Sequence, residues 1–257
     1  MNHSGKRVII TAAASGIGYA IAEAFLASGA EVHVCDIDDE KISSAAETHP
    51  ELGITRADAA NPDDVSRLFD EATAHLGGLD ILVNNVGIAG PTALMENIAP
   101  QEWDHTMRVN LGSHFYCSRL AIPILKEAGG GSIVNISSVA GRFGYPWHGP
   151  YAVSKAAVIA LTDTLAMELG EHNIRVNAIC PCAVDGPRMS DVIRIEAETR
   201  GEPLDKITDA YYRQNSMRTF IHKSDVANAI LFLTSEHGSK ISGQALSIDG
   251  NVETLRT

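Results

Sequence analysis

Short β-branched runs alternate with longer helix-like segments along the first 180 residues, and this alternation limits the possible fold more than any other feature of the chain. Strands are expected at residues 7–11, 31–36, 53–58, 80–83, 131–137, 174–179 and 245–248. Helices are expected at 17–28, 39–48, 100–128, 150–171 and 224–235, with another that begins at Asn61-Pro62. Strands that alternate with helices in this way run parallel, and right-handed crossovers place helices on both faces of a doubly wound sheet. Such sheets bind ligands at the carboxyl ends of their strands.

The composition fits a globular α/β protein that needs no cross-link in its core. Of 257 residues, 45% are hydrophobic and 20% are charged, and a chain of this length buries enough surface to fold without disulfides or a structural metal. We expect a single domain over residues 1–257. A charged helical insertion at about 186–219, between the sixth and the last strand, is expected to form a small substrate lobe.

Charge and cysteine content exclude several kinds of partner. The 20 basic and 32 acidic residues give a net charge of −12, and such a surface repels nucleic acid and anionic membranes. The four cysteines form no C-x-x-C pair and have no histidine at ligand spacing, so we expect a reducing, cytoplasmic location and no metal site. No apolar signal region and no run of 18 apolar residues occurs, which argues against a signal peptide and a membrane span.

Small residues follow the first expected strand, in the sequence TAAASGIG at 11–18. They allow a backbone to approach a pyrophosphate, and the next helix offers N-terminal amides, although tight strand–helix packing needs small residues too. Asp36 ends the second strand, 36 − 16 = 20 residues after Gly16, where an acid accepts hydrogen bonds from both ribose hydroxyls. Its charge repels a 2′-phosphate and its neighbours Ser15 and Ile37 are uncharged, which favours NAD over NADP. The alternative role for Asp36 is to cap a turn.

Tyr151 and Lys155 lie four residues apart on an expected helix, so their side chains share one face. An ammonium beside a phenol favours the phenolate and lowers the pKa of the phenol, which can then remove a proton from an alcohol. Pairs of this kind occur by chance on many helices. Here, however, the pair follows the fifth strand and the serines Ser137 and Ser138, which makes a catalytic role more specific.

Together these segments resemble the short-chain dehydrogenase/reductase family, in its branch without extended motifs, over essentially the full length of the chain. The matching segments are 11–18, Asp58-Ala59, Asn84-Asn85-Val86-Gly87, Asn110, Ile136-Ser137-Ser138, Tyr151-x-x-x-Lys155, 177–181, Ser242-Gly243 and Asp249-Gly250. Their order and spacing make chance agreement remote. The resemblance implies a Rossmann-type sheet of about seven strands in the order 3-2-1-4-5-6-7.

The resemblance also implies the catalytic residues. Tyr151 corresponds to the family's general acid/base, and Lys155 to the residue that binds the nicotinamide ribose and lowers the pKa of the tyrosine. Ser138 corresponds to the serine that hydrogen-bonds the substrate oxygen. Asn110 corresponds to the helical asparagine whose backbone holds a water in a proton relay. The implied reaction is hydride transfer to nicotinamide while Tyr151 takes the hydroxyl proton.

A larger set of residues is implied for the cofactor. These residues are Ser15, Gly16, Ile17, Gly18, Asp36, Ile37, Asp58, Ala59, Asn84, Asn85, Gly87, Tyr151, Lys155, Pro181 and Val184. Asp58 and Ala59 match the pair that binds adenine. Asn84 and Gly87 match the turn that supports the adenosine ribose. Val184, after Pro181, falls where backbone groups meet the carboxamide.

The sequence departs from the family pattern at three positions near the expected cofactor. Ala12 replaces a glycine, which costs about 1 kcal/mol if the backbone φ is positive there. Cys182 replaces a glycine after the proline, and either fills space as a small buried residue or places a thiol near the nicotinamide. Gly186 stands where a threonine or serine often contacts the carboxamide, so one hydrogen bond to the cofactor is expected to be missing.

Aromatic and basic side chains around the expected catalytic residues are candidates for the substrate pocket. They are Arg142, Tyr145, His148 and Arg188, and Ser138 joins them as the expected contact of the substrate oxygen. The aromatic residues could equally form a subunit contact, and the arginines could be solvated. These polar groups favour a small hydroxylated substrate, such as a polyol, sugar or hydroxy acid.

We therefore predict an NAD-dependent oxidoreductase that interconverts a secondary alcohol and a ketone. One alternative is a reductase of 3-oxoacyl thioesters on acyl carrier protein or coenzyme A, which the acidic surface and Asp36 disfavour. A more remote alternative is a non-catalytic NAD(H)-binding regulatory protein. The presence of Ser138, Tyr151 and Lys155 disfavours that reading. The resemblance further implies a homotetramer.

Overall fold

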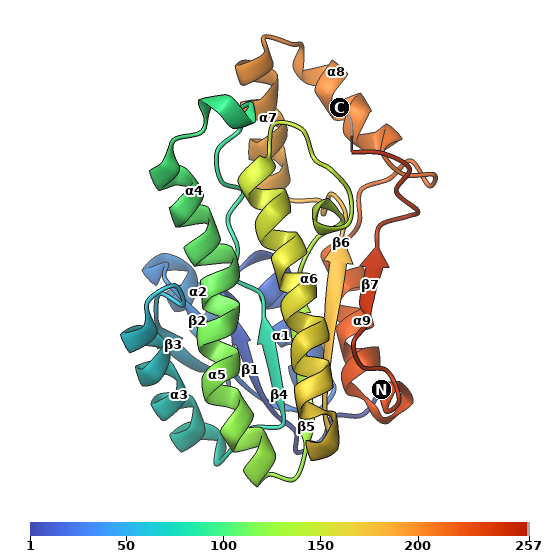
Figure 1. Ribbon diagram of the computed structural model, residues 1–257. Helices are drawn as coiled ribbons and strands as arrows, with labels where there is room; N and C mark the ends of the chain where they lie inside the picture. The colour runs from blue at the N-terminus through green and yellow to red at the C-terminus, as the bar shows by residue number, and fades with distance from the viewer. Residues whose placement is uncertain (256–257) are drawn as a thin grey trace.

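A computed structural model describes residues 1–255, and within them seven parallel strands form one sheet in the order β3-β2-β1-β4-β5-β6-β7 (Figure 1). The strands are β1 (Arg7–Thr11), β2 (Glu31–Asp36), β3 (Gly53–Arg56), β4 (Ile81–Asn84), β5 (Gly131–Ile136), β6 (Ile174–Pro181) and β7 (Ala245–Ile248). The predicted fold class and strand order are confirmed. The third strand ends at Arg56, earlier than the expected residue 58.

Helices cover both faces of this sheet. They are α1 (Gly16–Ala27), α2 (Asp39–Thr48), α3 (Pro62–Leu76), α4 (Pro100–Met107), α5 (Ser113–Glu127), α6 (Gly149–Leu169), α7 (Pro187–Arg200), α8 (Leu204–Arg213) and α9 (Lys223–Thr234). Helices α1 and α9 pack on one face of the sheet, and α3, α5 and α6 pack on the other. No helix within residues 1–255 has both the length and the apolar character that crossing a membrane requires.

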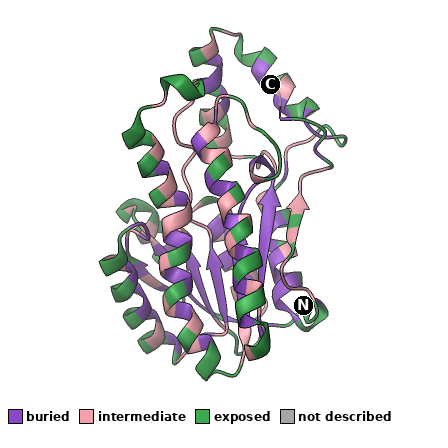
Figure 2. Ribbon diagram, in the orientation of Figure 1, coloured by how far each residue is buried: buried purple, intermediate pink, exposed green. Residues whose placement is uncertain are grey.

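The alternation of side chains along each strand divides the interior into two cores. In β1, Val8 and Ile10 pack with α1 and α9, whereas Ile9 packs with α3 and α5, because successive side chains of a strand point to opposite faces. Both faces are covered, so the strands are apolar almost throughout. Figure 2 shows the strands largely buried and the outward faces of the helices exposed.

Helix α3 begins as its sequence predicts. The side-chain oxygen of Asn61 accepts a hydrogen bond from the Asp63 amide at 3.0 Å, and Pro62 occupies the first turn. This side chain satisfies one of the amides that a helix leaves unpaired at its start. Gly77 ends the helix with a φ of 71°, which glycine adopts without strain.

The single helix expected at 100–128 is interrupted in the structure. Helix α4 is followed by a π-helical turn at Arg108–Gly112, and α5 follows that turn, with Pro123 inside it. Asn110 lies in the π turn, and two hydrogen bonds join its side chain to the backbone of Ile88. Turns of this kind are rare and occur frequently at functional sites.

The expected substrate lobe is helical, as predicted, and contains α7 and α8. Figure 1 shows both helices beyond the carboxyl end of β6, on the side toward which the strand arrows point. The two helices pack on each other through Ile193, Ala197, Ile207 and Tyr211. This small core fixes their mutual arrangement above the carboxyl ends of the strands.

Candidate active site

The turn that carries the predicted catalytic Ser138 packs closely against α6 at the carboxyl end of β5. The hydroxyl of Ser137 donates to the Lys155 carbonyl at 2.7 Å. A Cβ built on Gly141 would lie only 2.6 Å from the Lys155 carbonyl carbon, so the turn after Ser138 approaches α6 closely. Ser138 is 7% exposed, and its hydroxyl accepts from the Ala140 amide at 3.1 Å. Ser137 thus secures the helix and leaves Ser138 as the predicted substrate contact.

Lys155 is a buried cation beside the ring of Tyr151. Its Nζ lies 5.9 Å from the centre of that ring and donates a hydrogen bond to the Ile136 carbonyl at 2.8 Å. Burial, together with the positive charge of Arg188, lowers the pKa of Lys155 to about 7. Gly87 keeps space beside the ammonium, since a Cβ there would lie 3.0 Å from Nζ.

Asn110 joins the loop after β4 to α6. It is fully buried, its Oδ1 accepts from the Ile88 amide at 2.7 Å, and its Nδ2 donates to the hydroxyl of Ser154 at 3.0 Å. Ser154 precedes Lys155 on α6. The side chain of Asn110 therefore fixes the distance between these elements, and the proton relay through its backbone stays a prediction.

The backbone of the loop after β1 is strained at Ala12, the position where the family has a glycine. Ala12 has a φ of 51°, in the left-handed region, which costs about 1 kcal/mol relative to glycine. The side-chain amide of Asn85 holds this turn by donating to the carbonyls of Thr11 at 3.0 Å and Ala12 at 2.9 Å. Gly18 packs against the same turn, where a Cβ would lie 2.4 Å from the Ala12 oxygen.

The amino end of α1 fits the pyrophosphate of a dinucleotide. Ser15 precedes the helix with an extended backbone, and its side chain makes no capping hydrogen bond. A Cβ built on Gly16 would meet no atom within 4 Å, so the space next to the helix start is open. Amides in such a position bind anions, and no acidic residue stands in the first turn.

Asp36 is held in place by three backbone amides at the end of β2. Its carboxylate accepts from Ala14 at 3.1 Å, from Ile37 at 2.8 Å and from Asp38 at 3.3 Å. It therefore does organise a turn, as the alternative interpretation holds, and it is also oriented next to the loop after β1. The side chain of Ile37 is 57% exposed beside it.

Three more of the residues expected at the cofactor follow the carboxyl ends of β3 and β6. Asp58 accepts from the Ala60 amide at 2.9 Å, and Ala59 is buried. Val184 forms an isolated parallel bridge with Ile221. The predicted contacts of these residues with adenine and carboxamide stay predictions.

Two departures from the family pattern have clear local reasons. Gly186 has a φ of 145° immediately before α7, a conformation that a threonine or serine adopts only with strain. Burial raises the pKa of the Cys182 thiol to about 11. The Cys182 side chain packs against the apolar cluster that contains Val139 and Ala140. Both properties support a packing role for this thiol rather than a reactive one.

The expected substrate residues fall into three groups. The guanidinium of Arg142 donates to β7, to the Ser247 hydroxyl at 2.8 Å and to the Ala245 carbonyl at 3.3 Å. Arg188 is exposed at the start of α7, and its charge acts on Lys155. Tyr145 and His148 lie against a buried carboxylate, that of Glu196 on α7. Sequence reasoning missed Glu196, because an acid four residues before Arg200 reads as an ordinary exposed helix pair.

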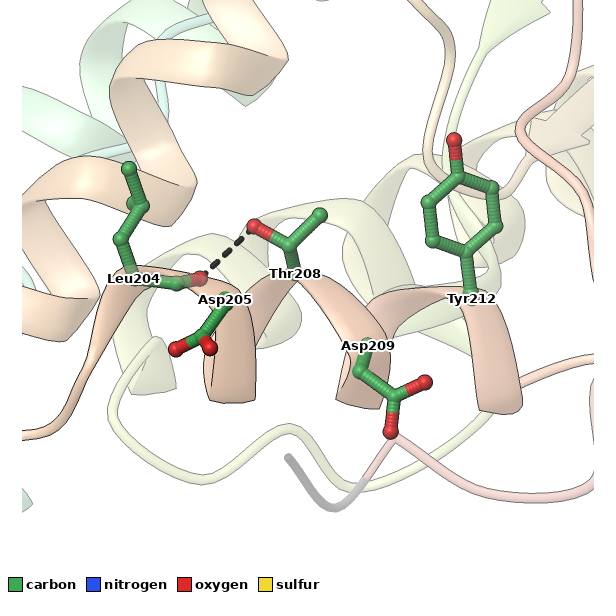
Figure 3. A pocket seen from close by; sticks show the side chains of 5 residues that line it. All are labelled: Leu204, Asp205, Thr208, Asp209 and Tyr212. Carbon is green, nitrogen blue, oxygen red and sulfur yellow. Dashed lines mark hydrogen bonds between the residues drawn. The ribbon is translucent and has the colours of Figure 1, made fainter.

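A hollow on α8 is separate from these residues. Leu204, Asp205, Thr208, Asp209 and Tyr212 line it. Figure 3 shows Leu204, Thr208 and Tyr212 projecting to one side of the helix and Asp205 and Asp209 to the other. The Thr208 hydroxyl donates a hydrogen bond to the Leu204 carbonyl at 2.7 Å. None of the residues predicted for the active site lines this hollow.

Comparison with known proteins identifies the class. A family model described as enoyl-(acyl carrier protein) reductase matches residues 11–252. The chain therefore belongs to the short-chain dehydrogenase/reductase family, whose members are oxidoreductases that bind a nicotinamide cofactor. The resemblance that the motifs indicated is confirmed.

Among individual proteins, the chain is similar to enzymes with different substrates. It is 35% identical to a 3-oxoacyl-(acyl-carrier-protein) reductase FabG of Thermotoga maritima, over 98% of this chain and 99% of the relative. It is 32% identical to a D-beta-hydroxybutyrate dehydrogenase of Rhizobium meliloti, over 95% and 97% of the two chains. The crystal structure of levodione reductase superimposes with a TM-score of 0.90 at 29% identity, covering 96% of this chain and 97% of that one.

Proposed function

We propose that this oxidoreductase interconverts a secondary alcohol and a ketone on a small polar substrate and uses NAD. The observation that carries the proposal is the buried Lys155 ammonium 5.9 Å from the ring of Tyr151, with the Ser138 turn packed against the same helix. A phenol, an adjacent cation and a hydroxyl donor are the groups that proton removal from an alcohol needs.

Each side chain has a distinct part in this reaction. The Tyr151 hydroxyl exchanges the proton with the substrate oxygen, and the Ser138 hydroxyl hydrogen-bonds that oxygen as its charge develops. The ammonium of Lys155 stabilises the phenolate by charge. When bound, the nicotinamide supplies the hydride acceptor or donor. Water is limited around the ammonium, because Lys155 is only 3% exposed.

The charge distribution near Asp36 supports NAD over NADP. The nearby cations are already paired, Lys41 with Asp38 and Arg56 with Asp39, each at 2.9 Å. A 2′-phosphate would therefore meet the carboxylate of Asp36 first, and would have to compete for these cations.

We expect Asp36→Asn to lower the ratio of kcat/KM for NAD to kcat/KM for NADP by about 10- to 100-fold. The variant loses a charged acceptor worth about 1.5–3 kcal/mol to the ribose hydroxyls and removes the repulsion of the phosphate. Initial rates with both cofactors measure the ratio. Asp63→Asn, an exposed acid on α3, is the matched control. An unchanged ratio in Asp36→Asn contradicts the assignment.

Arg188 supports a substrate with an anionic or strongly polar group. Its exposed guanidinium stands at the start of the substrate lobe, and its charge acts on Lys155. A hydroxy acid would place its carboxylate near that cation while its hydroxyl reaches Tyr151.

The test is a set of initial rates with polyols, sugars, hydroxy acids, sulfonated diols and steroid alcohols, each with NAD and with NADP. We expect turnover with NAD and a small polar alcohol. Reduction of 3-oxoacyl thioesters with NADPH, in place of that turnover, would support the thioester reductase instead, an activity that the name of one relative carries. Firm NADH binding without turnover of any compound would point to a regulatory protein.

We further propose that residues 1–257 act as one domain, with the substrate lobe at 186–219, in a cytoplasmic homotetramer. Large apolar side chains on the outer faces of α5 and α6 support assembly: Phe115 is 50%, Val153 41% and Met167 86% exposed. The four cysteines are free thiols, which fits a reducing compartment.

A further inference from the structure

A carboxylate is buried between the substrate lobe and the body of the protein. Glu196 on α7 has no exposed surface, and its Oε1 lies 2.6 Å from Nη1 of Arg200. Its Oε2 accepts a hydrogen bond from the Tyr211 hydroxyl at 2.7 Å. We call these three residues, together with Tyr145 and His148, the Glu196 cluster.

Hydrogen bonds in this cluster connect two parts of the chain. Tyr211 donates to Glu196, so Tyr145 donates to the oxygen of Tyr211, with which its hydroxyl is paired. Burial raises the pKa of both tyrosines, and both hydroxyls therefore stay protonated as donors. The rings of Tyr145 and His148 stack at 4.4 Å, and the His148 Nε2 lies 3.5 Å from the Glu196 Oε2.

The segment that the lobe contacts leads directly into the catalytic helix. His148 immediately precedes α6, and its carbonyl accepts from the Ala152 amide at 3.0 Å. Tyr151 lies between these residues. Tyr145 and Tyr151 also pack against the same apolar cluster, which includes Val139. A shift of Tyr145 can therefore reach Tyr151 through the apolar cluster that both rings contact and through the first turn of α6.

The backbone of the same segment, just before α6, is strained at Trp147, so contacts with the rest of the protein must hold it in this conformation. Trp147 has a φ of 69°, which is rare for a bulky residue. Arg200 lies over its ring at 6.0 Å, and the Trp147 carbonyl accepts from the Ala93 amide at 2.9 Å. Strained residues of this kind persist only where their surroundings enforce them, and they gather at functional sites.

We propose that Glu196, Tyr211 and Tyr145 are positioning residues that hold Tyr151 in its reactive place by joining the substrate lobe to the start of α6. The inference rests on the proposed alcohol–ketone chemistry. A buried ion pair adds little net stability compared with apolar residues of similar size. Its directional hydrogen bonds do fix the positions of the groups that they join. Here those groups lie between the lobe and the segment that leads to Tyr151.

The test compares single-atom changes with matched neighbours. Tyr211→Phe removes one hydroxyl and Glu196→Gln removes the charge, while Tyr212→Phe and Glu198→Gln alter exposed residues of the same two helices. We expect Tyr211→Phe and Glu196→Gln to lower kcat about 10-fold or more, since small displacements of a catalytic group have effects of this size. The KM for the cofactor should stay within about twofold, because its proposed site lies at β1 and β2.

A double variant tests whether the hydroxyls act as one chain. Tyr145→Phe combined with Tyr211→Phe should cost no more than either single change, because either change already breaks the chain of hydroxyls from Tyr145 through Tyr211 to Glu196. Effects that multiply would overturn the proposal. A rise of substrate KM with kcat unchanged would overturn it too, because it means that the cluster only shapes the pocket.

Hydrogen exchange provides a readout that does not depend on turnover. We expect Tyr211→Phe to speed exchange of amides 143–152 about 10-fold, with exchange in β1 and β4 unchanged. Unchanged exchange at 143–152 would overturn the proposal even if Glu196→Gln fails to fold. Faster exchange in a protein that turns over no alcohol would leave the physical connection supported and the proposed function refuted.

Discussion

Tyr151→Phe should lower kcat at least about 10³-fold while NADH binding stays within about twofold. The variant keeps the ring and its packing against Val139 but has no hydroxyl to exchange a proton with the substrate. General acid/base groups contribute about 10²–10⁴-fold to rates, and without one the alkoxide must form unaided. Steady-state rates with the best alcohol substrate measure kcat, and fluorescence titration with NADH measures binding.

Tyr212→Phe, which changes an exposed tyrosine on α8, is the control for this variant. Its ring lies 4.4 Å from that of Phe220, tilted by 38°. It should keep essentially wild-type rates. Retention of more than a few per cent of the activity by Tyr151→Phe contradicts the assignment of Tyr151 as acid/base.

Lys155→Met should have opposite effects on catalysis and stability. Loss of the ammonium beside Tyr151 should lower kcat/KM by about 10³-fold, since the charge that favours the phenolate is gone. The free energy of unfolding should rise by about 2–4 kcal/mol at pH 6, because a buried cation is replaced by an apolar chain of similar length.

The sign follows from the pKa of Lys155, which burial lowers from 10.5 to about 7. Between these values the unfolded chain binds more protons than the folded one, so the stability of the wild type increases with pH across that range. Below pH 7 the wild type bears the full free-energy cost of burying the charged Lys155, up to about 5 kcal/mol at about 1.36 kcal/mol per pKa unit. The lost hydrogen bond to Ile136 offsets about 1–3 kcal/mol of the gain.

Denaturant unfolding between pH 6 and pH 9 checks this expectation. The stability difference between Lys155→Met and wild type should narrow by about 1.4 kcal/mol per pH unit above pH 7. Lys126→Met, an exposed lysine on α5, should show no such pH dependence. A variant that is less stable than wild type at pH 6 rules out a destabilising ammonium at this position.

The sheet could be predicted from sequence because local signals and burial agree along it. The apolar runs of β1 and β4 have strand length, and Asn61-Pro62 marks a helix start that the structure reproduces. The Tyr151–Lys155 spacing placed both side chains on one helix face. These are short-range patterns, and each is readable without knowledge of the tertiary structure.

Other parts of the site depend on contacts between distant residues. The π turn around Asn110 accompanies its hydrogen bonds to Ile88, which lies 22 residues earlier, and no helical periodicity reports such a partner. Glu196 shows no sign of burial in the sequence, because the residue that it meets across the lobe contact, His148, lies 48 residues earlier. The positive φ of Ala12 depends on the contacts of the loop after β1, such as those with Asn85, and no local pattern in the sequence reports it.

The strand order has a consequence for how the chain acquires its site during synthesis. Strands β1 to β4 occupy neighbouring places in the sheet, in the order β3-β2-β1-β4, and all lie within residues 7–84. Each of the strands β1, β2 and β3 therefore finds all of its pairing partners among the first 84 residues. On a chain that is made from the amino end, the segments that carry the proposed pyrophosphate loop and Asp36 are synthesised before Tyr151. Tyr151 and Lys155 follow on the part of the chain that pairs at the edge of β4, and the lobe that holds Arg188 and Glu196 is translated after both.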